Sequence, residues 1–99
     1  MQVTLDINHN ETYVVHQIAE HNDGIVVQRV FDDKFTIDDT IDAVTSVVSV
    51  NEVFAYHSSM TKVDLIFTLS NSNENAAVRK VEDVVGYEVV SLTEFYREL

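Results

Sequence analysis

Two hydrophobic periods alternate along this chain, and their order constrains the fold more than any single motif does. From Ile25 onward, strand-like apolar runs alternate with segments whose apolar residues recur every three or four positions, as in helices. The resulting order is strand, helix, strand, strand, helix, strand. It predicts an α+β domain with a ferredoxin-like (split βαβ) arrangement, in which both helices cover one face of an antiparallel sheet. The other face is expected to stay open for a partner or a second copy.

Local patterns place the elements of this unit. We expect strands at 25–31, 53–56, 63–69 and 87–92, the first of them central because it has little polar interruption. The first helix is expected to start at a capping pair of Thr36 and Asp39, and the second at Asn73 or Asn75. Gly86 is expected to end the second helix. A short terminal helix, capped by Thr93, is expected at 93–99.

The N-terminal segment adds a strand and an ambiguous element. Val3, Leu5 and Ile7 alternate with polar residues, which indicates a half-buried strand. Segment 10–22 has an apolar helical face and capping-box spacing between Asn8 and Glu11, with Gly24 as the expected stop. Strand-forming residues at 12–15 and a hairpin signal at 22–24 favour a strand instead. We favour the helix because the capping pattern and the periodicity agree.

Composition limits the class of protein. The 99 residues contain two glycines and no proline, so no linker divides them, and we expect a single domain over 1–99. The absence of cysteine excludes disulfides and thiolate metal sites. The N-terminus has no basic, apolar signal pattern, and no apolar run approaches the length that spans a membrane. We therefore expect a cytoplasmic protein, of a cell or of an infected host.

Charge is the strongest functional signal. Seventeen Asp and Glu stand against six Lys and Arg, a formal net charge of -11. Small soluble domains are usually designed with a net charge of roughly 2 to 8 in magnitude. Such a field repels nucleic acids and anionic membranes and attracts basic surfaces. The densest acidic stretch, which we take as the candidate partner-binding site, consists of Asp32, Asp33, Asp38, Asp39 and Asp42. The last three are expected in the first turns of the helix that follows, where the helix dipole favours negative charge.

No pattern in the sequence indicates catalysis or a cofactor. The acidic stretch lacks the glycine and terminal glutamate of a calcium loop, and the histidines lack zinc-ligand spacing. His57, Ser58 and Ser59 are adjacent in an expected turn, where neighbouring side chains point apart. The aromatic residues mostly occupy strand positions and helix starts, so most of them are expected in the core. We therefore expect no enzyme, no metal and no cofactor.

Two functional hypotheses remain. The first is a non-catalytic acidic binding protein, a small inhibitor or regulator of the phage or mobile-element type, whose carboxylates imitate the phosphates of DNA and dock on a basic, nucleic-acid-binding protein surface. The alternative is an oligomeric structural or regulatory module, such as a homodimer, that uses its sheet as an interface. In that case the acidity is an adaptation for solubility or for a halophilic cell.

Overall fold

Strand β4 (Lys62–Leu69) forms the middle of the sheet, between β3 (Val50–His57) and β2 (Gly24–Phe31). The edges are β5 (Val89–Ser91), which pairs with β2, and β1 (Val3–Leu5), which pairs with β3. This computed structural model describes the backbone of residues 3–5, 11–70 and 73–99 and the side chains of residues 14–20, 22–70 and 73–99.

The sheet has the order β1-β3-β4-β2-β5. Strands β3, β4, β2 and β5 pair antiparallel, and β1 is added in parallel to the outside of β3. The register aligns one row of apolar residues across all four antiparallel strands: Phe54, Ile66, Val26 and Val90. The predicted α+β class with an antiparallel sheet is therefore confirmed, and β2, the strand expected to be central, is paired on both sides, with β4 and β5.

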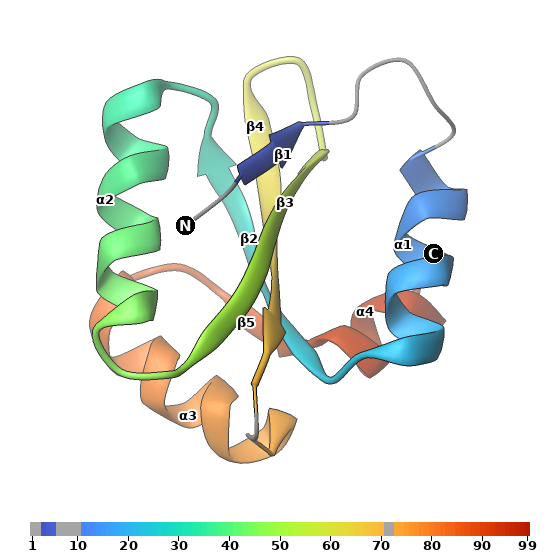
Figure 1. Cartoon of the computed structure of the whole chain (residues 1–99). Helices are drawn as coiled ribbons and strands as arrows, with labels where there is room; N and C mark the ends of the chain where they lie inside the picture. Colours follow the sequence, from blue (N-terminus) through green and yellow to red (C-terminus); the bar gives the residue numbers. More distant parts are fainter. Residues whose placement is uncertain (1–2, 6–10, 71–72) are drawn as a thin grey trace.

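Helices α2 (Lys34–Thr45) and α3 (Glu74–Val85) cover one face of this sheet (Figure 1). Side chains alternate along a strand, so every second residue of β4 points into this layer. The buried contacts include Val63, Leu65 and Phe67 of β4, Ile41 and Val44 of α2, and Ala77 and Val81 of α3. The two helices that the apolar periodicity predicted thus share one face of the sheet.

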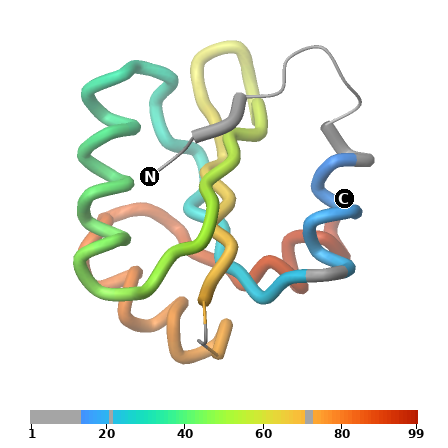
Figure 2. Tube along the Cα trace, viewed as in Figure 1, coloured from blue at the N-terminus to red at the C-terminus, as the bar shows by residue number. Residues whose placement is uncertain are grey.

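The opposite face is covered too, which contradicts the expectation that this face stays open. Helix α1 (Glu11–His21) and helix α4 (Leu92–Arg97) lie on this side of the sheet (Figure 1). They are in contact with each other, and Figure 2 shows them close together. They enclose a second core of Val15, Ile18, Val26, Ile66, Leu92 and Phe95. The uncovered face was expected because neither of these helices was assigned to a layer.

Helix starts show where the sequence prediction was right and where it was wrong. Asn73 caps α3 by accepting hydrogen bonds from the backbone N–H groups of Asn75 and Ala76, and Gly86 ends the helix at φ 69°. Helix α2, in contrast, begins at Lys34 behind the cap Asp33, and not at the expected Thr36–Asp39 pair. Asp33 was missed as the cap because Thr36 was itself taken for the capping residue. In the structure Thr36 is the third residue of the helix, and its N–H donates to the Asp33 cap.

The chain ends also differ in part from expectation. The helical interpretation of 10–22 is confirmed by α1, whereas its expected cap Asn8 and the strand residue Ile7 lie outside the described residues. Gly24 begins β2 and does not cap α1. At the other end, β5 is shorter than predicted, and Ser91 caps α4 in place of Thr93, since its hydroxyl accepts from the Glu94 N–H at 3.1 Å.

Candidate functional site

Asp33, one of the predicted partner-binding residues, is the N-terminal cap of helix α2. Its backbone is extended, and its carboxylate accepts from the Thr36 N–H at 2.8 Å and from the Thr36 hydroxyl at 2.7 Å. Both hydrogen bonds favour the ionised form, and they hold the pKa of Asp33 below its ordinary value, the backbone bond having the larger effect. This carboxylate is negative, but part of its hydrogen-bonding capacity is already used inside the molecule.

Asp32 belongs to the neighbouring turn and not to the helix. Its backbone N–H donates to the Thr61 carbonyl, and its Oδ2 lies 3.7 Å from Nε2 of His57. Asp32 and Asp33 are adjacent in the sequence, yet they serve two different elements. The acidic stretch is therefore divided at its first two residues.

The other three aspartates lie along α2 and point in two directions. Asp38 and Asp42 are four residues apart, so they share one face of the helix, and both are exposed. Lys34 reaches Asp38 at 3.4 Å, an exposed pair of small energetic value. Asp39 lies about 100° farther round the helix, as the period of 3.6 residues requires. It faces the groove between α2 and α3.

The observed start of α2 at Lys34 corrects one expectation about the helix dipole. The sequence placed Asp38, Asp39 and Asp42 in the first turns, where negative charge is stabilised. Because α2 begins at Lys34, its first turn contains no acidic residue. The dipole effect falls off within that turn. The three exposed aspartates are thus retained on the helix without the local stabilisation that was expected for them.

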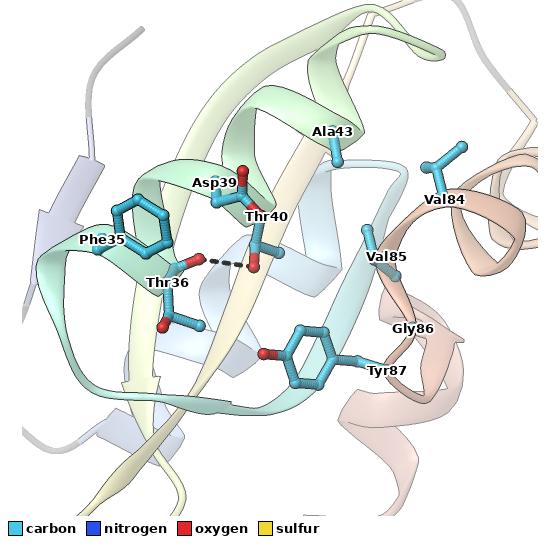
Figure 3. A pocket seen from close by; sticks show the side chains of 9 residues that line it. All are labelled: Phe35, Thr36, Asp39, Thr40, Ala43, Val84, Val85, Gly86 and Tyr87. Carbon is cyan, nitrogen blue, oxygen red and sulfur yellow. Dashed lines mark hydrogen bonds between the residues drawn. The ribbon is translucent and has the colours of Figure 1, made fainter.

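A hollow of about 400 Å³ opens beside Asp39. One wall is the α2 face of Phe35, Thr36, Asp39, Thr40 and Ala43, and the other is the end of α3 and the residues after it, Val84, Val85, Gly86 and Tyr87 (Figure 3). The left-handed Gly86 turns the chain at the end of α3, and the Tyr87 ring then extends towards α2. The Thr40 hydroxyl donates to the Thr36 carbonyl at 2.8 Å, so it is satisfied within the wall.

Phe35 lies at the rim of this hollow, and 81% of the residue's surface is exposed. Most aromatic residues were expected in the core, and that expectation is wrong for Phe35 and for Phe31, which is 54% exposed. The sequence contained one indication that Phe35 is exposed. The apolar stripe of this helix runs through Ile37, Ile41 and Val44, and position 35 is not on it. A large exposed aromatic ring at the rim of a hollow is a candidate anchor for a partner, because aromatic residues are enriched at protein interfaces.

Carboxylates outnumber cations on both helices that form the hollow. Helix α3 carries the exposed Glu82 and Asp83 close to its end, and its last turn has no basic residue. The end of a helix carries partial negative charge from its unpaired carbonyl groups, which adds to these side chains. The positive end of α2, by comparison, is already occupied by the Asp33 carboxylate. The hollow is therefore a place where a cation is favoured.

A second hollow, of about 410 Å³, lies on another part of the surface. Gln28, Arg29, Ser58, Ser59, Lys62 and Asp64 line it. Asp64 is buried and accepts from the Arg29 backbone N–H at 2.8 Å, and burial raises its pKa above the ordinary value against the opposing effect of that hydrogen bond. Ser58 hydrogen-bonds to this carboxylate, while the neighbouring His57 faces Asp32. These contacts hold the strands together and direct Ser58 and His57 to different carboxylates.

Within the described residues, no three histidine, cysteine, aspartate or glutamate side chains come together in a way that could hold a metal ion. No helix among them has both the length and the apolar character needed to cross a membrane. No protein-family model matches the sequence, and no curated protein matches it. The candidate site therefore rests on geometry and charge.

Proposed function

We propose that this protein is a non-catalytic acidic binding protein, a small inhibitor or regulator that docks the outer side of α2 on a basic, nucleic-acid-binding protein surface. The observation that carries the proposal is the combination, on one helix, of the exposed carboxylates of Asp38, Asp39 and Asp42 with the exposed ring of Phe35. Charged groups of one sign give rate and orientation, and a buried aromatic anchor gives affinity. A helix that served only solubility would not need the anchor.

Imitation of DNA is the specific form of the proposal. Carboxylates fixed on a helix are presented at set spacings, as phosphates are along a DNA strand. The Lys and Arg side chains with which a basic protein neutralises DNA phosphates can pair with these carboxylates instead, so the two ligands compete for one surface. The phage or mobile-element setting belongs to this proposal as the circumstance in which such inhibitors act.

The test uses the immobilised protein and lysate proteins retained at low salt. We expect the retained partner to be a nucleic-acid-binding protein that is eluted steeply by moderate salt and displaced by duplex DNA. A triple variant, Asp38→Asn with Asp39→Asn and Asp42→Asn, should lose it. The matched control, Glu52→Gln with Glu94→Gln and Glu98→Gln, removes the same charge from exposed positions outside α2 and the hollow, and should keep most of it. Equal loss in both variants, or retention that ignores salt and DNA, would overturn the proposal.

The fold supports a narrower description of the scaffold, which we also propose. The four strands from Gly24 to Ser91 and the helices α2 and α3 form a ferredoxin-like unit, to which α1, α4 and β1 are additions. In support, each of the helices connects strands that are not neighbours, and β4 and β2 lie between the strands so connected. An experimental structure compared with known split βαβ domains tests this description.

The oligomeric alternative depends on which surface is free. Pairing through an open sheet face has lost its premise, since α1 and α4 lie on that face. Sedimentation at micromolar concentration tests the remaining route, pairing through a sheet edge. Unfolding measured with and without molar potassium chloride tests the halophilic reading, because a halophilic protein should unfold as salt is removed.

A further inference from the structure

The exposed ring of Phe35 is the starting point, because a second ring of the same chain shows what such a ring attracts. Lys62 places its ammonium group 5.1 Å from the centre of the Phe31 ring, within the range of a cation–π contact. Phe35 is more exposed than Phe31, and within the described part of the chain no cation lies over it. A cation supplied by a partner would make the same contact there.

Asp39 gives that cation a second point of attachment. Phe35 and Asp39 are four residues apart on α2, so they are neighbours on one face of the helix, and both line the hollow in Figure 3. A side chain that entered beside them would meet an aromatic face and a carboxylate together. The Lys34–Asp38 pair involves the other acidic face, so it leaves Asp39 available.

The opposite wall suits an aliphatic stem. Val84 and Val85 present apolar groups, Ala43 is small, and Val84 is itself 43% exposed. The hollow is near the lower end of the roughly 300 to 1,000 Å³ typical of small-molecule pockets. A long side chain with an apolar stem and a charged tip therefore fits this lining better than a compact polar molecule does.

We propose that the hollow between α2 and α3 receives an arginine side chain of the basic partner, whose guanidinium stacks on Phe35 and pairs with Asp39. Arginine is preferred to lysine because its planar group can stack on a ring and bind a carboxylate through two donors at once, whereas an ammonium group acts as a hydrated point charge. This inference rests on the proposed function and deepens it, since it names the residue type that the acidic surface selects.

Hexa-arginine and hexa-lysine are the probes, because they carry equal charge and differ in the group that matters. Binding is measured by fluorescence anisotropy at low salt, and amide shifts in NMR spectra report the location. We expect hexa-arginine to bind the wild-type protein at least about tenfold more tightly, because a guanidinium can stack flat on the ring and still donate a second charge-assisted hydrogen bond to the carboxylate, which an ammonium group cannot do. The amides that shift most with hexa-arginine should be those of 35–43 and 84–87.

Two matched pairs of variants locate the preference. Phe35→Ala should bring the two affinities to within about twofold of each other, while Phe31→Ala, which removes the other exposed phenylalanine, should leave the difference intact. Asp39→Asn should weaken hexa-arginine more than Asp42→Asn, which removes the same charge from a residue of α2 that does not line the hollow. Phe35→Leu keeps an apolar side chain, and a loss of arginine preference in this variant as well assigns the effect to the ring.

The outcomes separate this inference from the proposed function. Equal affinity for both peptides with a steep salt dependence, or equal effects of the Phe35 and Phe31 variants, overturns the arginine site and leaves the acidic docking surface standing. If neither peptide binds at low salt, the acidic docking surface and the arginine site are both overturned. Unfolding curves of each variant confirm that the fold is kept, as expected for side chains this exposed.

Discussion

The backbone N–H of Arg29 donates to the Asp64 carboxylate at 2.8 Å, and this bond fixes an irregularity in the middle of the sheet. The pairing of β2 with β4 passes from Val27–Leu65 to Val30–Val63, so two residues of β2 stand opposite Asp64 alone. This is a β-bulge, and Arg29 occupies it at φ 58°, a left-handed conformation that is unfavourable for a residue with a side chain. The buried carboxylate supplies the acceptor that the regular ladder no longer provides.

Replacing Asp64 with alanine is the first test of this relationship. Asp64→Ala leaves the Arg29 N–H without its acceptor, and we expect a loss of roughly 1 to 3 kcal/mol in the free energy of unfolding. Asp64→Asn keeps an acceptor oxygen of similar shape and removes the buried charge, so it should lose clearly less. Urea unfolding of both variants measures the difference, and equal losses would show that the hydrogen bond does not carry the effect.

The strain at Arg29 predicts an unusual order of substitutions. Glycine adopts the left-handed conformation without penalty, whereas alanine retains the steric conflict of Arg29. Both changes remove the exposed ion pair with Glu88 equally, so that pair cancels in the comparison. We expect Arg29→Gly to be more stable than Arg29→Ala by about 1 kcal/mol, although alanine restricts the unfolded chain more. Thermal and urea unfolding give the order, and the reverse order contradicts the assigned strain.

Asp64 and Asp33 should give opposite pH dependences, because the fold shifts their pKa values in opposite directions. The pKa of Asp64 is raised from 3.8, so the folded state holds a proton that the unfolded state has released. Its contribution to stability therefore declines as pH rises from 3.8 through the raised value. The pKa of Asp33 is lowered from 3.8, so its contribution is present above 3.8 and is lost as pH falls through the lowered value.

Unfolding free energies measured from strongly acidic to neutral pH separate the two contributions. The stability difference between the wild type and Asp64→Asn should change above pH 3.8, in favour of the variant as pH rises. The difference between the wild type and Asp33→Asn should change below 3.8, in favour of the variant as pH falls. If both differences changed in the same pH window, at least one assigned direction would be wrong.

Periodicity predicted the elements of this fold well, because the information was local. Ile37, Ile41 and Val44 lie on the buried stripe of α2, and Gly86 ends α3 at positive φ, as their patterns indicated. The helix at 11–21 was favoured on the same grounds. In each case the residues that decide the structure lie within one or two helical turns of each other.

The remaining features depend on residues that are far apart in the sequence. The bulge at Arg29 needs Asp64, thirty-five positions away, and nothing in the Gln28–Arg29 pair itself indicates it. The covered second face needs Phe95 and Leu92 to meet Val15 and Ile18. At the site, the acidic stretch was visible, but its division among the His57 contact, the helix cap and the groove was not. The wall that Val84 and Tyr87 contribute comes from another helix.

Gly24, the first residue of β2, lies directly against β4 on one side and Leu92 of α4 on the other. A Cβ atom at this position would lie 2.5 Å from the Phe67 carbonyl oxygen and 2.9 Å from Cδ2 of Leu92. The first of these is backbone, which cannot turn away as a side chain can. Gly24→Ala should therefore push α4 away from the sheet and destabilise the protein by about 1 to 3 kcal/mol or more, as overpacking does in a closed core.

Gly86→Ala is the matched control, because it makes the same chemical change where nothing lies within 4 Å of the added atom. There the alanine meets only the unfavourable left-handed conformation, which costs about 1 kcal/mol. We expect Gly24→Ala to be the more damaging of the two and to raise amide hydrogen exchange in α4 and α1, since both helices depend on the same packed face. In Gly86→Ala, we expect faster amide hydrogen exchange only in α3, with the exchange of α4 unchanged. Equal destabilisation, or unchanged exchange in α4 of Gly24→Ala, contradicts it.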